Sequence, residues 1–318
     1  MDPMARIPRS GTRIDLEADG TTASIASIGA SLRSLRADGR DLVVPFDADV
    51  VRPSFRGTTL APWPNRVIGG RYRFRGVERQ LALTEPSRGH ALHGLAAWRD
   101  WRVVGADASS VELALEIEPS DGYPWRLDVR TTYAIVGGAL TQHVRVESLD
   151  DEAAPWGTGP HPYLVAGPSP LETWTLELPA SAVQTVTDER LVPVALEDVA
   201  IDAERFDFRR ARTLGDVRID HAFTRLTRDE EGLATVVVRD PGGSGVAVRW
   251  DDACPWVQIH TADLPGEDRA LGHRAGLAVE PMTCAPGALD EDLLGYEAGV
   301  VTLEPGAAHE ASWTIVAA

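Results

Sequence analysis

Apolar and polar residues alternate along most of the chain with a period of two, which is typical of strands that are buried on one face. The alternation is clearest at residues 111–117, 125–135 and 140–146. An Asp-Gly pair at 121–122 and a Gly-Gly pair at 137–138 separate these segments. Both dipeptides tolerate the backbone angles of tight hairpins. We therefore expect three consecutive antiparallel strands.

Shorter segments of strand character recur through the rest of the chain, at 12–17, 22–28, 71–75, 77–83, 172–178, 234–240, 245–250, 255–261, 277–281 and 308–316. A Pro-Gly-Gly turn at 241–243 separates two of them. Only the short acidic segment Leu289–Tyr296 has the composition of a helix. These features predict an all-β fold class, with two large sheets packed face to face, because sheets of this size must stack to bury a face.

No repeat, linker or low-complexity segment divides the 318 residues. We therefore expect a single domain over residues 1–318, with 1–10 as a disordered or loosely packed N-terminus. That terminus lacks the apolar run of a signal peptide, and no segment reaches the length of a membrane span. Cys254 and Cys284 are too few for a disulfide framework and are expected to be buried thiols. These observations predict a cytoplasmic protein with no membrane partner.

The charged residues exclude several classes of function. The formal net charge is −17, and no basic stripe interrupts it, so a nucleic acid is not an expected partner. The chain contains no lysine, and all 31 basic residues are arginine. A Schiff-base aldolase and a P-loop nucleotide enzyme both require a lysine amine. A neutral small-molecule ligand fits this composition better.

Three loop segments place polar side chains among Pro, Gly and Trp. Asn65 and Arg66 end a run with two prolines, His93 lies in the Gly-flanked segment 89–94, and His161 lies between two prolines. Prolines stiffen the backbone, which suits a general acid at His161. The alternative for Asn65 and Arg66 is a solvated surface turn. His90 and His93 form an H-x-x-H pair, but no third ligand completes a zinc signature, so a hydrogen-bonding role is favoured.

Two carboxylates complete the candidate set. Asp220 and His221 interrupt an apolar stretch, for which a turn at a strand end is an equal alternative. Glu280 ends an apolar strand, and burial there would raise its pKa enough for it to act as a base near neutral pH. The tryptophans are expected to fill the space between sheets, including Trp156, Trp174, Trp250 and Trp256.

Taken in order, six short motifs of the chain resemble those of the aldose 1-epimerase (galactose mutarotase) family. They cover nearly the whole chain, which makes a chance match hard to obtain. They are Pro64-Asn65-Arg66, Leu92-His93-Gly94, His161-Pro162-Tyr163, Asp220-His221, Val257-Gln258-Ile259 and Val279-Glu280. The resemblance implies a large antiparallel β-supersandwich, a sugar in an open cleft, and no cofactor, neither metal nor nucleotide.

The resemblance also implies roles for single residues. Glu280 matches the base that removes the proton of the C1 hydroxyl, and His161 matches the acid that protonates the ring oxygen. His93 matches a second histidine that steadies charge during ring opening. The residues implied to bind the sugar hydroxyls are Asn65, Arg66, Asp220 and Gln258. Where a tyrosine is common, this chain has His260, and Leu-Val-Ala follows Tyr163 instead of Phe-Asn, so galactose or glucose is only the default substrate.

Two other functions fit the same motifs. A hexose-6-phosphate epimerase would need an arginine cluster for the phosphate, which could come from Arg52, Arg56, Arg71, Arg73 and Arg75. The alternation of the last three with Tyr72 and Phe74 favours the solvent face of a strand instead. A non-catalytic carbohydrate-binding module would not need both Glu280 and His161. The oligomeric state cannot be deduced from the sequence.

Overall fold

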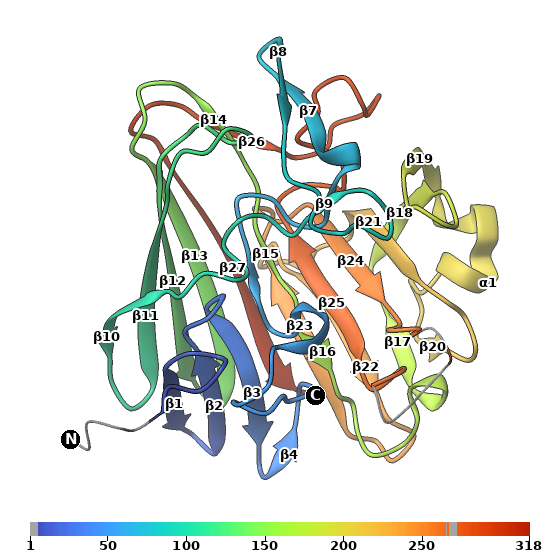
Figure 1. Cartoon of the computed structure of the whole chain (residues 1–318). Helices are drawn as coiled ribbons and strands as arrows, with labels where there is room; N and C mark the ends of the chain where they lie inside the picture. Colours follow the sequence, from blue (N-terminus) through green and yellow to red (C-terminus); the bar gives the residue numbers. More distant parts are fainter. Residues whose placement is uncertain (1–5, 265, 267–271) are drawn as a thin grey trace.

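The computed structural model describes residues 6–264, 266 and 272–318, and its architecture is mostly β (Figure 1). The largest sheet has nine antiparallel strands. In spatial order they are β10 (Arg102–Ala106), β11 (Ser110–Ile117), β12 (Leu127–Val136), β13 (Ala139–Ser148), β27 (Ala308–Ala317), β23 (Gly245–Trp250), β22 (Ala234–Arg239), β17 (Thr175–Glu177) and β20 (Arg212–Thr213). The three expected consecutive strands are therefore confirmed as β11, β12 and β13, paired in sequence order.

A second large sheet has six strands and carries the candidate site. Its spatial order is β16 (Tyr163–Leu164), β25 (Leu277–Met282), β24 (Trp256–His260), β21 (Asp220–Leu226), β18 (Ala180–Val186) and β19 (Pro193–Asp198). In Figure 1 the orange strands β24 and β25 lie to the right of the green strands β11–β13. One continuous apolar core contains Val144 and Val248 from the nine-stranded sheet and Val257 and Val279 from the six-stranded sheet.

Smaller sheets and hairpins complete the fold. Four strands at the N-terminus form one sheet: β1 (Arg13–Ala18), β2 (Thr21–Ala26), β3 (Ser31–Ala37) and β4 (Arg40–Asp41). The other strands pair in twos: β5 (Thr59–Leu60) with β15 (Gly159–Pro160), β6 (Arg66–Val67) with β9 (Ala91–Leu92), β7 (Arg71–Phe74) with β8 (Val77–Gln80), and β14 (Ala154–Trp156) with β26 (Val301–Leu303). The pairs β5–β15 and β6–β9 include or adjoin three of the sequence motifs.

The expected helix at Leu289–Tyr296 is wrong, because the chain forms turns there. The acidic side chains of this segment bind backbone groups instead. The Asp290 carboxylate accepts a hydrogen bond from the Asp292 N–H, and Glu291 accepts from the N–H groups of Arg75 and Gly76. Such bonds compete with helix formation. The one α-helix of the described residues is α1 (Ala203–Phe206), which the sequence pattern did not predict.

Most other expectations for single residues are confirmed. Trp156, Trp174, Trp250 and Trp256 are buried, and so are the thiols of Cys254 and Cys284. The expected strand at 172–178 is shorter than predicted, since a 3-10 turn occupies Leu171–Thr173. Of the N-terminal stretch, residues 1–5 lie outside the described part, whereas Ser10 is buried and donates its N–H to the Ala48 carbonyl.

Candidate active site

Strand alternation positions the reactive groups of the six-stranded sheet on one face. Val257 and Val279 point into the core, so their neighbours Gln258 and Glu280 point to the opposite face. The register pairs Gln258 with Glu280 and Asp220 with His260 directly across the strands. Directly opposed side chains of a sheet lie within contact distance. Four polar side chains from β21, β24 and β25 are thereby gathered on a single face.

Apolar residues enclose this polar group on the same face. One small cluster contains Ala222, Trp256 and Met282, and another contains Tyr163 and Ala278. Glu280 lies between Ala278 and Met282 in the alternation of β25, and it is 2% exposed. The carboxylate is therefore held in an environment from which most water is excluded.

His161 faces Glu280 from the turn between β15 and β16. Its Nε2 lies 3.6 Å from the Glu280 Oε1, and its side chain is also buried. The His161 carbonyl accepts a hydrogen bond of 2.7 Å from the Gly57 N–H, which ties this turn to the segment that follows Phe55. The Phe55 ring in turn packs near the rings of His93 and His161. Both imidazoles are thus fixed in place by backbone bonds and aromatic contacts.

Asn65 and His93 hold each other through the backbone. Both residues have left-handed backbone φ angles, 54° and 61°, which residues other than glycine rarely adopt. The His93 N–H donates to the Asn65 carbonyl at 2.8 Å, and the Asn65 N–H donates to His93 Nδ1 at 3.2 Å. Because Nδ1 accepts, the proton of the neutral ring is on Nε2. The His93 ring lies 5.0 Å from the His161 ring, centre to centre.

Arg66 is fixed by a buried carboxylate that the sequence analysis missed. Glu85 accepts two hydrogen bonds from Arg66, at 2.8 and 3.0 Å, and a third from Arg88 at 3.0 Å. Arg66 also donates to the Asn65 side-chain oxygen at 3.2 Å. A bidentate pair of this kind orients the guanidinium strictly. Glu85 lies in a loop of ordinary polar composition, so the sequence carries no local signal for this role.

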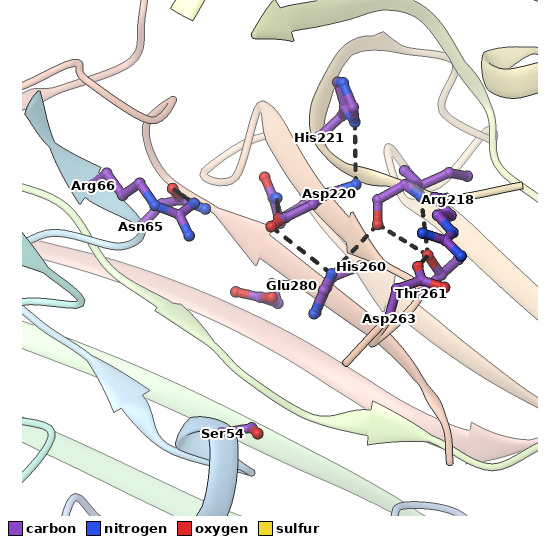
Figure 2. A network of polar contacts seen from close by, with 12 residues as sticks. Ser54, Asn65, Arg66, Arg218, Asp220, His221, His260, Thr261, Asp263 and Glu280 are labelled. Atoms are coloured by element: carbon purple, nitrogen blue, oxygen red, sulfur yellow. Dashed lines mark hydrogen bonds and ion pairs between the residues drawn. The ribbon is translucent and has the colours of Figure 1, made fainter. Parts of the chain in front are cut away.

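Asp220 belongs to a polar network that continues past the end of β24 to Thr261 and Asp263 (Figure 2). The Gln258 side-chain amide donates to Asp220 at 2.6 Å, and His260 Nδ1 lies 3.9 Å from the other carboxylate oxygen. The Asp220 N–H donates to His221 Nδ1. Figure 2 shows the His221 ring on the far side of Asp220 from Glu280.

All seven residues singled out from the sequence line one cavity of about 310 Å³. They are Asn65, Arg66, His93, His161, Asp220, Gln258 and Glu280. The lining also includes Arg56 and His260, and with them Phe55 and Glu85, to which the sequence analysis gave no site role. Two buried oxygens of the site, Oε1 of Gln258 and Oε2 of Glu280, accept no hydrogen bond from any described residue. They are placed to bind a polar ligand.

Burial controls the charges in this cavity. It raises the pKa of Glu280 well above the ordinary value of 4.5, and the nearby Asp220 carboxylate raises it further. Burial also lowers the pKa of His161 to about 3. By contrast, the pKa of Asp220 is lowered despite burial, because His260, Arg66 and Gln258 favour its charged form. At the six-stranded sheet, an ionised carboxylate, Asp220, therefore lies beside a neutral pair formed by Glu280 and His161.

The arginine cluster considered for a phosphate is not assembled. Arg71, Arg73 and Arg75 bind Gln80, Asp292 and Glu304 at the β7–β8 hairpin and do not line the cavity. Arg52 is buried and donates to the carbonyls of Ile28 and Ala97. Among the five candidates only Arg56 lines the cavity, where its guanidinium lies over the Tyr163 ring.

His90 and His93 have separate environments. His90 Nδ1 accepts from the Gly69 N–H, and its Nε2 lies 2.8 Å from the Arg190 carbonyl. His90 therefore supports the loop, whereas His93 lines the cavity. Within the described part of the chain, no group of three or more His, Cys, Asp or Glu side chains is placed to hold a metal ion.

Comparison with known proteins identifies the family. The family model described as Aldose 1-epimerase matches residues 12–315. The chain belongs to the aldose 1-epimerase family. The six ordered motifs, which suggested this family, all fall within the matched range.

Relatives in this family share most of the chain's length. The Escherichia coli protein YihR, which is described as uncharacterised, is 34% identical over 293 residues, covering 91% of this chain and 90% of that protein. The galactose mutarotase of mouse is 25% identical over 304 residues, covering 86% of each chain.

Solved structures share the fold of this aldose 1-epimerase family member. A galactose mutarotase-like protein from Clostridium acetobutylicum has a TM-score of 0.84 at 16% identity, covering 98% of this chain and 97% of that one. An aldose epimerase homologue from Caenorhabditis elegans has a TM-score of 0.82 at 20% identity, covering 96% and 98%. Together with the observed sheets, these similarities confirm the expected all-β, galactose mutarotase-like fold. Among the described residues no helix is long and apolar enough to cross a bilayer.

Proposed function

We propose that this member of the family is an aldose 1-epimerase that interconverts the α and β anomers of a free sugar. The supporting observation is the pair of buried groups, Glu280 and His161, whose reactive atoms lie 3.6 Å apart at the cavity wall. Their pKa values are shifted in opposite directions by burial, so the pair holds one proton near neutral pH. Anomer exchange needs one such proton, which can be carried by either the base or the acid.

The reaction follows from the position of that proton. When it is on His161, the Glu280 carboxylate removes the proton of the C1 hydroxyl while His161 protonates the ring oxygen, and the C1–O5 bond breaks. The product is an open-chain aldehyde. Rotation about the C1–C2 bond then presents the other face of the carbonyl. Ring closure returns both protons and gives the opposite anomer, with no net change in the pair.

The remaining residues of the cavity position the sugar. Arg66, fixed by Glu85, presents donors, and the Asp220 carboxylate presents acceptors. The free oxygen of Gln258 accepts from a hydroxyl group. His93, with its proton on Nε2, donates toward the charge that develops during ring opening. Several donors and acceptors at fixed positions are what distinguish one sugar stereoisomer from another.

Polarimetry of freshly dissolved sugars tests this proposal. α-Glucose, α-galactose and several pentoses are followed to equilibrium with wild type, Glu280→Gln and His161→Asn, and the spontaneous rate is subtracted. We expect wild type to accelerate the mutarotation of at least one sugar. Each substitution should lower that catalysed rate at least about 100-fold. His143→Asn, at a partly exposed histidine of β13 outside the cavity, is the matched control and should keep full activity.

The alternatives predict different outcomes in the same experiment. A hexose-6-phosphate epimerase would accelerate only glucose 6-phosphate, which is therefore added to the sugars named above. A non-catalytic carbohydrate-binding module would bind a sugar by calorimetry and accelerate none. Either result would contradict the proposal, and so would full activity in Glu280→Gln.

A further inference from the structure

The two histidines of the site pack against an aromatic side chain to which the proposed reaction gives no role. The Phe55 ring lies 4.6 Å from the His93 ring, centre to centre. It lies 6.3 Å from the His161 ring, with an angle of 24° between the two ring planes. The two imidazole rings are themselves 5.0 Å apart, edge to face. The three rings therefore form one cluster, and all three residues line the cavity.

The backbone holds Phe55 in a conformation that it would rarely adopt by itself. Ser54 and Phe55 are consecutive residues with left-handed φ angles, 48° and 52°, although neither is glycine. Strained conformations of this kind persist only where the surrounding structure holds them. Here the Phe55 carbonyl accepts a hydrogen bond from the Thr58 N–H at 3.1 Å, and the Ser54 carbonyl accepts one from the Tyr163 hydroxyl at 3.2 Å. The position of the Phe55 ring is thus fixed by the fold.

A second aromatic side chain supports Phe55 without lining the cavity. The Trp98 ring lies 5.4 Å from the Phe55 ring, and 52% of this tryptophan is exposed. The guanidinium carbon of Arg52 lies 4.5 Å from the centre of the Trp98 ring. Arg52 is buried and donates hydrogen bonds to the Ala97 carbonyl at 2.6 Å and to the Ser31 hydroxyl at 2.7 Å. Since Ala97 precedes Trp98 directly, Arg52 holds both the ring and the backbone of this loop.

The aromatic cluster keeps water from the two imidazoles. His93 and His161 are each only 5% exposed, whereas Phe55 is partly exposed. Burial lowers the pKa of His161 to about 3 and that of His93 well below 6.5. An apolar ring beside an imidazole favours the neutral form, because it excludes the water that would stabilise the charged form. Removing the Phe55 ring would admit water to both histidines.

The titratable and charged groups around His161 remain in place when only Phe55 is changed. They are Glu280 on β25, His93 after β9, Tyr163 on β16, and Asp220, His260 and Arg52. Burial has the largest influence on the pKa of His161, His260 and Arg52 lower it further, and Asp220 raises it. A change in the titration of His161 in a Phe55 variant therefore reports on shielding by the ring.

We propose that Phe55 is a positioning residue for anomer exchange, whose ring holds His93 and His161 in place and shields them from water, and that Trp98 supports it. The inference rests on the proposed epimerase function. Trp98 lies outside the cavity lining, so it contributes to the reaction only through its contact with Phe55.

Polarimetry with variants of Phe55 tests this proposal. kcat/KM is measured against pH for the sugar that wild type accelerates most. We expect Phe55→Ala to lower kcat/KM at about pH 7 by at least about tenfold, because both histidines lose their support. The acid limb of its pH profile should move upward by at least about one pH unit, from about 3 toward 6.5. Phe55→Leu keeps an apolar side chain and should recover most of both changes.

A double variant tests whether Trp98 acts through Phe55. Trp98→Ala alone should move the acid limb in the same direction by a smaller amount. Added to Phe55→Ala, it should change kcat/KM less than about twofold, because the contact that it removes is already lost. Phe74→Ala, at a phenylalanine that packs on Trp125 outside the cavity, is the matched control and should keep the acid limb of wild type.

The outcomes separate the two proposals. If wild type accelerates a sugar and Phe55→Ala keeps the acid limb of wild type, the inference about Phe55 is wrong and the epimerase function stands. A lower rate without a shifted limb would show only a contact between Phe55 and the sugar. If no sugar is accelerated, both proposals fall. Should Phe55→Ala not fold, as judged by circular dichroism, Trp98→Ala must move the acid limb upward by itself.

Discussion

At the scale of single residues, the proposed chemistry depends on desolvation. His161 and Glu280 are each almost fully buried, and burial favours the neutral form of both an imidazole and a carboxyl group. Asp220 lies in the same cavity, but the nearby His260, Arg66 and Gln258 favour its charged form. Neighbouring carboxyl groups in one cavity therefore have different protonation states, which is a common feature of acid–base active sites.

The shared proton predicts the pH dependence of the rate. On the acid side, kcat/KM should fall as the pH drops through about 3. There the His161 ring becomes charged, and the pair of Glu280 and His161 holds two protons instead of one. On the basic side it should fall as the pH rises through the raised pKa of Glu280, where the pair loses its only proton. Stopped polarimetry across the pH range checks this, with circular dichroism as a control for folding. An acid limb at the ordinary histidine value of 6.5 would contradict the shared-proton pair.

The same shift predicts a cost in stability. A carboxyl group whose pKa is raised in the folded state binds its proton more tightly there than in the unfolded chain. Its stabilising effect is therefore complete below the unfolded value of 4.5 and is lost as the pH rises toward the folded value. Glu280→Gln has no such loss. We expect its Tm to exceed that of wild type by more at about pH 8 than at about pH 5.

Differential scanning calorimetry at the two pH values measures this difference. Glu291→Gln, at a carboxylate on an exposed turn, is a control that should not show the same pH trend. A gap between Glu280→Gln and wild type that shrinks with rising pH would show that Glu280 is ionised in the folded protein.

At the scale of elements, close approach of two loops determines where His93 lies. Gly94 follows His93 directly and has a φ of 75°. A Cβ atom built there would lie 2.0 Å from the Ala61 carbonyl oxygen, which is backbone and cannot move aside cheaply. The loop that carries His93 therefore packs against the 61–66 segment only because this residue has no side chain.

Gly94→Ala should accordingly destabilise the protein and displace His93. We expect a loss of about 3 kcal/mol or more in the free energy of unfolding, measured by urea titration, and a fall in kcat. Gly105→Ala is the control, since an added Cβ in β10 meets no atom within 4 Å. It should change the free energy of unfolding by less than about 0.5 kcal/mol. Equal stability of the two variants would show that the loops can separate freely.

At the scale of the whole molecule, the two thiols report on different apolar clusters. Cys254 belongs to the main core between the sheets, and Cys284 belongs to the smaller cluster beside the site with Trp256 and Met282. Burial raises the pKa of both thiols, that of Cys284 to about 12. Neither thiol should be reactive in the folded protein.

If the chain is a single domain, both clusters should unfold together. We expect a thiol reagent to label Cys254 and Cys284 with the same urea midpoint, which should coincide with the loss of tryptophan fluorescence. Cys254→Ser and Cys284→Ser assign the signal to each thiol. Two separated midpoints would contradict the prediction of one domain over residues 1–318.

The sequence by itself determined many of the strands and the set of reactive groups. Alternation with period two predicted the strands observed as β11, β12 and β13, because successive side chains of a strand point to opposite faces. Proline and glycine marked the loops that carry Asn65, His93 and His161, since these residues restrict or extend the backbone angles locally. Local rules were sufficient for these features, and the order of the motifs was sufficient to suggest the family.

Only the tertiary structure decided which distant segments meet. The pairing of β13 with β27 and the bidentate hydrogen bond that Arg66 donates to Glu85 both join residues that no local pattern connects. The turns at 289–296 arise because Asp290 and Glu291 bind the β7–β8 hairpin, a partner more than 200 positions away. Such contacts form where bringing distant segments together buries the most apolar surface. That burial is a property of the whole molecule and not of any local segment.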